Sequence, residues 1–290
     1  MNRAGFSPFQ MKTIASALTE TRQRLAGLTE TPSLDAQVLL AHVTGKDRTW
    51  VLAHPEHTLD TEGTLRLADA LAQLSTGVPL PYVLGEWQFF GLPFKVTPKV
   101  LIPRPETELL VEMALEWMNA NPARNRVIEV GTGSGCIAVS LAASRPGLHL
   151  TATDISPDAL QIARHNARTN QVEDRITFRE ASLLTGIPGP FDLICANLPY
   201  IPSQKLRRLP VFLREPTLAL DGGENGLEII GLLLAQAAAK LAPGGLILLE
   251  IESGHPSEAK ALAQHHFPQA EVSLHQDLAG QARIVLVQAP

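Results

Sequence analysis

The chain has 290 residues, of which 45% are hydrophobic and 18% are charged. At roughly 150 residues per domain, this length suggests one large domain or two of ordinary size, and the hydrophobic content excludes wholesale disorder and fibrous architectures. The 24 lysines and arginines are outnumbered by 29 acidic residues, so the net charge of −5 disfavours broad binding to a phosphate backbone, although a local basic patch is still allowed.

The first 80 residues are predicted to form a small N-terminal bundle of three amphipathic helices. Ser7 followed by Pro8 is typical of an N-cap with proline at the first helical position, and apolar residues then recur at helical spacing. A second helix is expected from Ser33 to Gly45, and a third is expected to end near Gly77. Because this bundle contains no cluster of acidic, histidine or cysteine residues, we expect a partner-recognition domain rather than a chemical one.

Residues 81–104 are predicted to form a hairpin or an extended linker between two domains. Between Gly77 and Pro105, prolines and glycines interrupt aromatic and β-branched residues such as Trp87, Phe89 and Val96. This mixture favours extended structure over helix, so we place the domain boundary in this segment.

Residues 105–290 alternate between strand and helix patterns, which predicts an α/β domain. The strands are rich in valine, isoleucine and leucine, as in a mostly parallel, doubly wound sheet. The last two strands, at Glu271–Leu274 and Ile284–Val287, are expected to form a closing pair. The other expected strands are 126–130, 149–153, 176–179, 191–196 and 245–251, and the expected helices are 107–119, 136–144, 157–169 and 227–241.

A glycine-rich turn, Gly131-Thr-Gly133-Ser-Gly135, follows the first of these strands and opens a helix. Glycines let the backbone turn sharply and approach a ligand closely. Asp154 lies 19 residues after Gly135, at the end of the next strand, where a carboxylate can accept hydrogen bonds from both hydroxyls of a ribose. A dinucleotide fingerprint would need a glycine at Cys136, so the spacing favours S-adenosylmethionine, while a dinucleotide site and a purely structural turn stay open.

A second motif, Asn197-Leu198-Pro199-Tyr200, stands at the end of strand 191–196, on the edge that faces the ligand crevice of an open α/β sheet. The nitrogen of a planar amide or exocyclic amine is a poor nucleophile because its lone pair is delocalised. The Asn197 side-chain oxygen and the Leu198 carbonyl can hold its two N–H groups and aim it at a sulfonium methyl. Pro199 would stiffen the loop, and the Tyr200 ring would offer a face to the planar group. The same residues also fit a plain loop start.

The order of these features predicts an amino-group methyltransferase. The glycine turn, Asp154 and the Asn197–Tyr200 segment end three different strands of one predicted sheet. Transfer from a sulfonium is an in-line displacement, so positioning and polarisation should carry most of the rate, and no strong base is required.

Over essentially its whole length the chain resembles the HemK/PrmC family, the peptide chain release factor N5-glutamine methyltransferases. The likeness includes a helical N-terminal domain of about this size and three further segments: Ile102–Glu108 at the start of the catalytic domain, Glu215–Leu227 after the acceptor motif, and Asp277–Arg283 in the terminal hairpin. Each segment also fits a structural role, as a helix start with Thr107 as its cap, a glycine-rich turn, and a hairpin turn with a structural arginine.

The resemblance implies a class I, Rossmann-like methyltransferase that methylates the side-chain amide (N5) of the glutamine in the Gly-Gly-Gln motif of class I release factors and so tunes translation termination. The N-terminal bundle would grip the body of the release factor. The cofactor would be S-adenosyl-L-methionine, with S-adenosyl-L-homocysteine as product and no metal. The implied catalytic residues are Asn197, Pro199 and Tyr200, and the substrate site adds Leu198, Arg104 and Glu108. The implied cofactor site comprises Glu129, Gly131, Thr132, Gly133, Ser134, Gly135, Asp154, Ile155, Ser182, Leu183 and Asn197.

The chain departs from the family pattern at two positions. Leu198 stands where the family has the first proline of Asn-Pro-Pro-Tyr; since the expected contact is a backbone carbonyl, leucine can supply it with some loss of rigidity. Ser182 stands where an acid usually contacts the adenine amino group, and its hydroxyl is a weaker partner.

Two other functions stay open. The motif Asn-Leu-Pro-Tyr is also similar to that of the ribosomal RNA adenine dimethyltransferases, so the alternative is an adenine N6-methyltransferase acting on ribosomal RNA or DNA. The net negative charge of the chain and the position of the helical domain before the catalytic domain argue against this nucleic-acid methyltransferase. The second open function is a non-catalytic adaptor that keeps the cofactor-binding fold. The intact Asn197 and the intact glycine turn argue against such a loss of activity.

The sequence favours a cytoplasmic protein. Residues 1–10 lack the basic start and apolar run of a signal peptide, and the longest apolar stretch, Ile229–Ala239, is too short to span a bilayer. Cys136 and Cys195 form no CxxC pair and are predicted to be buried thiols in a reducing compartment. We expect no membrane contact, nucleic acid is disfavoured as a partner, and nothing in the sequence requires more than a monomer.

Overall fold

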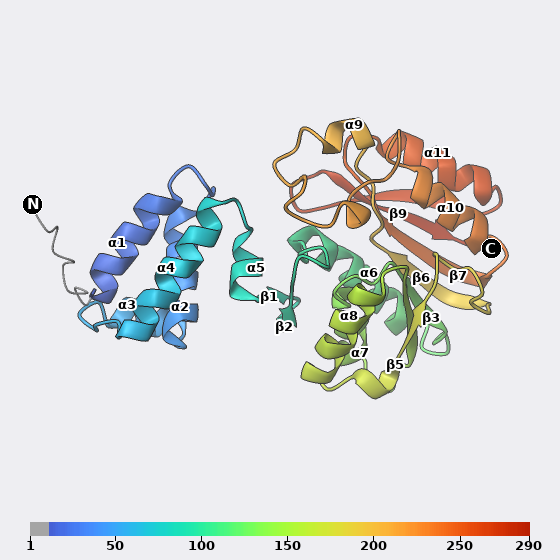
Figure 1. Cartoon of the computed structure of the whole chain (residues 1–290). Coiled ribbons are helices and arrows are strands. Elements are labelled where there is room, and N and C mark those ends of the chain that lie inside the picture. Colours follow the sequence, from blue (N-terminus) through green and yellow to red (C-terminus); the bar gives the residue numbers. More distant parts are fainter. Residues whose placement is uncertain (1–11) are drawn as a thin grey trace, which may run out of the picture. The chain divides into compact units, whose positions relative to one another are not determined.

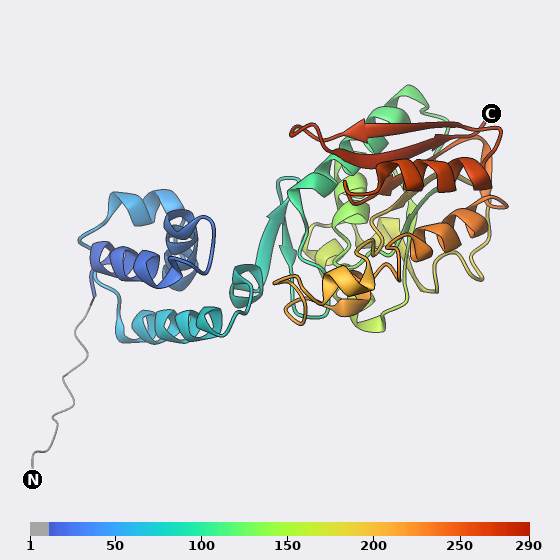
Figure 2. The same cartoon turned by 90° about the horizontal axis from the view of Figure 1, so that it is seen from above.

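The computed structural model describes residues 12–290 and divides into two compact units, residues 1–85 and residues 86–290 (Figures 1 and 2). The first unit is helical, and the second contains the sheet predicted from the sequence. Among the described helices, none has the length and apolar character needed to cross a lipid bilayer.

The first unit has five helices within residues 12–85, where the sequence predicted three. Its core is apolar, with Leu39, Leu40 and Val51 fully buried. Ser7 and Pro8, expected to start the first helix, lie outside the described residues; that helix begins after Thr13, whose hydroxyl accepts a hydrogen bond from Ser16 N. The helices are α1 (Ile14–Leu25), α2 (Pro32–Thr44), α3 (Arg48–Ala53), α4 (Thr61–Ser75) and α5 (Leu80–Leu84).

The two unexpected helices, α3 and α5, are single short turns with local causes. Asp47 caps α3 by accepting a hydrogen bond from Trp50 N over 2.7 Å. Pro79 is the N-cap of α5 and Pro81 falls in its first turn, where its missing N–H group costs nothing, and Gly85 ends the helix in the left-handed conformation. The expectation of extended structure in residues 81–104 is therefore wrong for residues 81–84, which are helical.

The rest of that segment contains the predicted hairpin, formed by β1 (Glu86–Phe89) and β2 (Leu92–Lys95), and it belongs to the second unit. Asn166, which is fully buried on α8 (Pro157–Thr169), fixes the hairpin in place. Its carboxamide accepts from Lys95 N over 2.8 Å and donates to Lys95 O over 3.0 Å and to Ser134 O over 2.8 Å. One side chain therefore joins the hairpin, a helix and the glycine turn.

A seven-stranded sheet forms the centre of the second unit, residues 86–290, all of which the structure describes. The strand order is β5-β4-β3-β6-β7-β9-β8; the first five strands are parallel, and β9 runs antiparallel to both β7 and β8. This order confirms the predicted doubly wound, mostly parallel sheet with a closing strand pair. The strands are β3 (Val127–Val130), β4 (Leu150–Asp154), β5 (Ile176–Glu180), β6 (Phe191–Ala196), β7 (Leu241–Glu250), β8 (Glu271–Gln276) and β9 (Ala282–Gln288).

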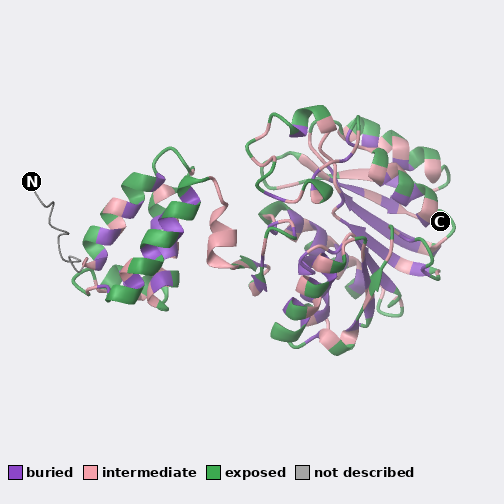
Figure 3. Ribbon diagram, in the orientation of Figure 1, coloured by how far each residue is buried: buried purple, intermediate pink, exposed green. Residues whose placement is uncertain are grey.

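Helices cover both faces of the sheet, and the strands between them are buried (Figures 1 and 3). One apolar cluster packs α6 and α7 against the sheet, and a second packs α10 and α11 against the other face. The helix α11 was not predicted; Pro256 occupies its first turn, and only Ala259 and Ala263 are buried, so its apolar signal is weak. The remaining elements are η1 (Pro105–Thr107), α6 (Glu108–Ala120), α7 (Cys136–Ser144), η2 (Glu173–Arg175), α9 (Ser203–Leu206), η3 (Thr217–Ala219), α10 (Glu228–Ala237) and α11 (Pro256–His266).

The strand order reverses at β3, which has β4 on one side and β6 on the other. In the parallel register Val130 pairs with Ala196, so the residues that follow these two strands emerge side by side. A crevice forms at such a reversal because the connecting helices leave in opposite directions. We call the side of the sheet where β3, β4, β5, β6 and β7 end the carboxyl edge, and the side where they begin the amino edge.

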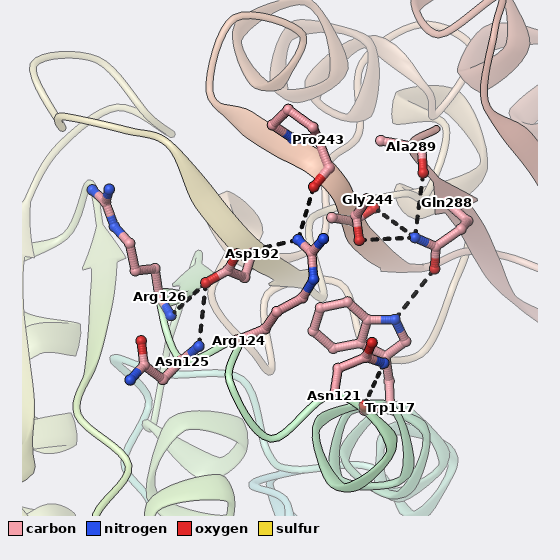
Figure 4. A network of polar contacts seen from close by, with 11 residues as sticks. Trp117, Asn121, Arg124, Asn125, Arg126, Asp192, Pro243, Gly244, Gln288 and Ala289 are labelled. Carbon is pink, nitrogen blue, oxygen red and sulfur yellow. Dashed lines mark hydrogen bonds and ion pairs between the residues drawn. The ribbon is translucent and has the colours of Figure 1, made fainter.

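At the amino edge, a network of hydrogen bonds ties the starts of the strands together (Figure 4). The Asp192 carboxylate accepts from Asn125 N, Arg126 N and the Arg124 guanidinium over 3.0–3.3 Å. The same guanidinium donates to Pro243 O over 2.8 Å. The Gln288 amide accepts from the Trp117 indole and donates to the carbonyls of Gly244, Gly245 and Ala289. We call these residues the amino-edge network.

Candidate active site

A cavity of about 790 Å³ opens at the carboxyl edge, in the crevice between β3 and β6. A volume of this size suits a nucleoside-sized cofactor together with a side chain of a second substrate. Most residues predicted from the sequence line it, whereas Gly135, Tyr200 and Glu108 do not. The predicted residues that line the cavity are Arg104, Glu129, Gly131, Thr132, Gly133, Ser134, Asp154, Ile155, Ser182, Leu183, Asn197, Leu198 and Pro199.

The glycine turn, Gly131–Gly135, is shaped by backbone contacts to the neighbouring strand. Gly131 N and Thr132 N both donate to Thr153 O over 2.8 Å. Gly131 has φ +74°, and a Cβ there would lie 2.7 Å from the Leu198 side chain. The positive φ disfavours any side chain at this position, and a Cβ would also require the Leu198 side chain to shift. The turn therefore brings its backbone to the cavity.

Gly135 has a different task, which explains why it does not line the cavity. Its φ is +81°, and a Cβ would come within 3.1 Å of Ala163 on α8. The absence of a side chain lets α7 begin against α8 at close range. Gly135 thus allows α7 and α8 to pack closely and does not face the cavity.

Asp154, the last residue of β4, holds the glycine turn from the side. Its two carboxylate oxygens accept from Gly133 N and Ser156 N, each over 2.8 Å. Burial raises the pKa of this carboxyl above its ordinary value, and the backbone hydrogen bonds oppose that rise. The Asp154 carboxylate also lines the cavity, where an ionised carboxyl can accept a hydrogen bond from a ligand hydroxyl.

Glu129 lies beneath the turn and is 1% exposed. Its Oε2 accepts from the Thr132 hydroxyl over 2.5 Å and from Ala138 N over 3.0 Å. Burial raises its pKa to about 8 despite those two hydrogen bonds, and the nearby charge of Asp154 adds to the rise. A buried acid that lines the cavity in this way would gain from a positively charged ligand group.

The segment after β5 forms the next wall. Ser182 is exposed and Leu183 is half-buried, and both line the cavity. Leu183 has φ +54°, a strained conformation for a leucine, and its carbonyl accepts from the Thr153 hydroxyl over 3.2 Å. The wall is thereby fixed to the same strand that carries Asp154.

Asn197 follows β6 and meets the cavity with one end of its carboxamide fixed. Its Nδ2 donates to the Thr107 hydroxyl oxygen over 3.0 Å. A carboxamide has one accepting and one donating end. One of the two amide hydrogens is committed to Thr107, which orients the carboxamide, and the oxygen is the end that accepts no hydrogen bond from the described residues. The Leu198 side chain is 5% exposed and packs into the apolar core, and Pro199 lines the cavity.

Two predicted substrate residues, Tyr200 and Glu108, lie outside the cavity lining, and a third, Arg104, is paired within the chain. The Tyr200 hydroxyl donates to Glu250 Oε1 over 3.3 Å, away from the cavity lining. The Glu108 carboxylate accepts from Phe90 N over 2.7 Å and so stabilises the turn of the β1–β2 hairpin. Arg104 does line the cavity, but its guanidinium pairs with the buried carboxylate of Glu215.

The segments named in the family resemblance pack around this site. Within Glu215–Leu227, Asp221 Oδ1 accepts from the Ser203 hydroxyl over 2.6 Å, and Gly222 N donates to Ile201 O. Both contacts bind this loop to the residues that follow Tyr200. In the terminal hairpin, Arg283 Nε donates to Asp277 Oδ2 over 2.8 Å, as expected for a structural arginine.

Sequence reasoning missed Thr107, Glu250 and Glu215 as residues of this neighbourhood. The sequence offers a helix cap as one alternative role for Thr107, yet its side chain makes no capping hydrogen bond and accepts from Asn197 instead. Glu250 had a detectable signal, because an acid ends the apolar strand Leu246–Leu249. Cys136 and Cys195 are free and buried, as predicted. No cluster of three or more metal-ligating side chains occurs in residues 12–290.

These residues fit a cofactor with a ribose and a charged amino-acid tail. The cradle at Gly131 leaves room that a Cβ would fill, Asp154 can accept from hydroxyls, and Glu129 can balance a positive charge. Together with an accepting carboxamide at Asn197, the arrangement can hold an N–H group beside such a cofactor.

Comparison with known proteins gives two family models and many relatives. The PrmC N-terminal domain matches residues 16–85, and the methyltransferase small domain matches residues 106–277. A release factor glutamine methyltransferase from Moorella thermoacetica is 42% identical over 278 residues, which is 94% of this chain and 98% of that protein. Another, from Deinococcus radiodurans, is 39% identical over 271 residues, with 92% and 95% covered.

Among solved structures, the chain is similar to a T. thermophilus 16S rRNA N2 G1207 methyltransferase in complex with AdoMet and guanosine. The TM-score is 0.52 at 17% identity, with 71% of this chain and 50% of that chain covered. At this level of identity the likeness supports the class I methyltransferase fold and nothing finer.

Proposed function

The chain belongs to the release factor glutamine methyltransferase family, and on that premise we propose that it transfers a methyl group from S-adenosyl-L-methionine to the glutamine side-chain nitrogen (N5) in the Gly-Gly-Gln motif of class I release factors. The observation that carries this function beyond family membership is the fixed carboxamide of Asn197, whose free end is a hydrogen-bond acceptor in the cavity. An acceptor is what an attacking NH2 group needs.

The walls of the cavity would hold the cofactor. Gly131–Gly135, Glu129, Asp154, Ile155 and the Ser182–Leu183 segment are the residues we assign to it, with Asp154 taking the ribose hydroxyls. When bound, S-adenosyl-L-methionine supplies a methyl group on a positively charged sulfur. The buried Glu129 and the half-buried Asp154 favour a cationic ligand, because an opposite charge nearby offsets the cost of taking each carboxylate out of water.

Asn197 and Leu198 would hold the glutamine amide. The Asn197 oxygen and the Leu198 carbonyl accept the two N–H groups, which fixes the nitrogen and favours its pyramidal, attacking form. As the new N–C bond forms, the C–S bond breaks and its electron pair stays on sulfur. Methylation makes the nitrogen strongly acidic, so its extra proton leaves to solvent and the site needs no strong base.

We propose that the first unit recognises the body of the release factor. Its match to the PrmC N-terminal domain covers residues 16–85, and its described residues contain no group of three or more metal-ligating side chains. Exposed leucines on its surface, Leu28, Leu34, Leu52 and Leu65, offer apolar contacts. We further expect a cytoplasmic monomer that releases S-adenosyl-L-homocysteine.

A competition assay tests this function. The protein is given labelled S-adenosyl-L-methionine with a class I release factor, ribosomal RNA and DNA together, and the modified atom is mapped by mass spectrometry. We expect label on the N5 of the Gly-Gly-Gln glutamine alone. Label on the N6 of adenine in RNA or DNA would overturn the proposal in favour of a nucleic-acid methyltransferase, and cofactor binding without transfer would indicate an adaptor.

A further inference from the structure

A chain of polar side chains lies directly behind Asn197, and neither the family comparison nor the proposed function assigns it. Asn197 Nδ2 donates to the Thr107 hydroxyl oxygen over 3.0 Å. Thr107 is 1% exposed, so water does not compete for its hydroxyl. Because that oxygen accepts from Asn197, the hydroxyl hydrogen is free to be donated elsewhere.

Glu250 is the neighbouring acceptor. Its Oε2 is buried and has no hydrogen-bond partner among the described residues, and the nearby Thr107 hydroxyl lowers the pKa of its carboxyl. Glu250 is 1% exposed and ends β7, which pairs in parallel with β6 so that Ala196 lies opposite Leu249. The register therefore places Glu250 level with Asn197 on the neighbouring strand.

Glu250 also binds the other end of the acceptor motif. The Tyr200 hydroxyl donates to Glu250 Oε1 over 3.3 Å. One buried carboxylate thus accepts from Tyr200 at Oε1 and leaves Oε2 as the open acceptor for the Thr107 hydrogen. Through Thr107, the same carboxylate can act on Asn197, the first residue of the motif, as well as on Tyr200, the last.

We propose that Thr107 and Glu250 are positioning residues that set which end of the Asn197 carboxamide faces the acceptor nitrogen. This inference rests on the proposed function. Glu250 commits the Thr107 hydrogen, so the Thr107 oxygen acts only as an acceptor and selects the NH2 end of Asn197. Without that commitment, the hydroxyl could donate to the Asn197 oxygen and the carboxamide would turn over. Its NH2 group would then face the substrate NH2 group, donor against donor.

The orientation of Asn197 in this proposal depends on the protonation state of Glu250. Burial raises its pKa to about 7, while the Thr107 and Tyr200 hydroxyls act to lower it. The other titratable groups that act on it or on which it acts are Glu106 on η1, Arg283 on β9 and Cys136 on α7. A protonated Glu250 carries its own hydrogen and can donate to Thr107, which releases the constraint on Asn197.

The test uses a matched pair of full-length variants, Thr107→Val and Thr107→Ser. Valine keeps the shape of threonine without the hydroxyl, and serine keeps the hydroxyl. For methylation of a class I release factor we expect kcat to fall about tenfold in Thr107→Val, the size of one lost hydrogen bond, and to stay within about twofold of wild type in Thr107→Ser. The Kd for S-adenosyl-L-methionine should be unchanged in both. Equal kcat in wild type and Thr107→Val, or equal losses in the two variants, would overturn the inference.

Two further measurements separate this inference from the proposed function. In 15N-labelled protein, the side-chain NH2 hydrogens of Asn197, assigned through their absence in Asn197→Asp, should exchange slowly in wild type and Thr107→Ser and faster in Thr107→Val. This result decides the inference even if wild-type protein fails to methylate the release factor. In active protein, kcat should fall below about pH 7, and Glu250→Gln should lower kcat while removing that pH dependence; an unchanged pH profile in Glu250→Gln contradicts the role of Glu250.

Discussion

The two edges of the central sheet use polar side chains in opposite ways. At the amino edge the Asp192 carboxylate accepts from three donors, and the Gln288 amide uses both its oxygen and its nitrogen. At the carboxyl edge, burial raises the pKa values of Glu129, Asp154 and Glu250 despite the hydrogen bonds that these acids accept. The charged groups at the amino edge are well compensated within the chain, whereas the acids at the carboxyl edge are compensated only in part.

The difference teaches where stability and function reside in this unit. A saturated network contributes to the free energy of unfolding and has nothing to offer a substrate. Under-compensated buried acids reduce stability but bind a cationic partner well. Substitutions at the two edges should therefore have opposite signatures, and four predictions test this.

The largest effect is expected for Asn197→Ala at the carboxyl edge. Loss of the accepting oxygen should lower kcat for methyl transfer by about 10²–10³-fold, the range seen when one preorganised hydrogen-bonding group is removed from an active site. The Kd for S-adenosyl-L-methionine, measured by calorimetry, should change little. Asn125→Ala is the matched control, because the exposed Asn125 contributes only its backbone N–H to the amino-edge network. Near-normal turnover in Asn197→Ala would refute the role of Asn197.

Asp154→Ala should act on affinity. We expect S-adenosyl-L-methionine to bind more weakly by about 1.5–3 kcal/mol, the scale of a lost charge-assisted hydrogen bond. Equilibrium dialysis or calorimetry measures the change, with Asp192→Ala as the control acid from the opposite edge. If the two variants bind the cofactor equally well, the ribose is held elsewhere.

Asp192→Ala should act on stability instead. It leaves Asn125 N, Arg126 N and Arg124 without their shared acceptor, so we expect the free energy of unfolding to fall by about 1–2 kcal/mol. Urea denaturation measures this value. At a temperature where the variant is folded, kcat should equal that of wild type; a loss of kcat there would mean that the edges are not independent.

The fourth prediction concerns the pH dependence of stability. The pKa of Glu129 is about 8 in the folded chain against an ordinary value of 4.5, so between these values the folded protein binds more protons than the unfolded chain. The stabilising contribution of the protonated group is complete below pH 4.5 and is lost as the pH rises toward 8. In urea titrations of the cofactor-free protein, Glu129→Gln should flatten the decline in unfolding free energy over this interval. An identical pH slope in both proteins would contradict the assignment.

The sequence predicted the fold class and most elements of the second unit because their hydrophobic patterns are strong. The bounds of α7, α8 and β6 agree with the prediction to the residue. The missed helices α3, α5 and α11 are short or weakly apolar, and the first two depend on the local cap at Asp47 and the prolines at 79 and 81 rather than on periodicity.

The candidate site was predictable where residues follow strands and not where they meet across the fold. Glycine spacing and strand ends identified the turn, Asp154 and Asn197, which line one cavity, while their roles stay predictions. Nothing in the sequence separates Thr107, which contacts Asn197, from Glu108, which binds Phe90 N instead. These two adjacent residues make contacts in different parts of the fold, and only tertiary packing decides which contact each of them makes.

The buried carboxamide of Asn166 has a consequence for motion. It holds both backbone groups of Lys95 and the carbonyl of Ser134, segments far apart along the chain. The hairpin cannot open locally without disturbing the glycine turn, so the two should unfold together as one cooperative unit. A ligand that stabilises the glycine turn should consequently slow deuterium uptake at the Lys95 amide. Exchange at this amide of the hairpin would then report whether the crevice is occupied.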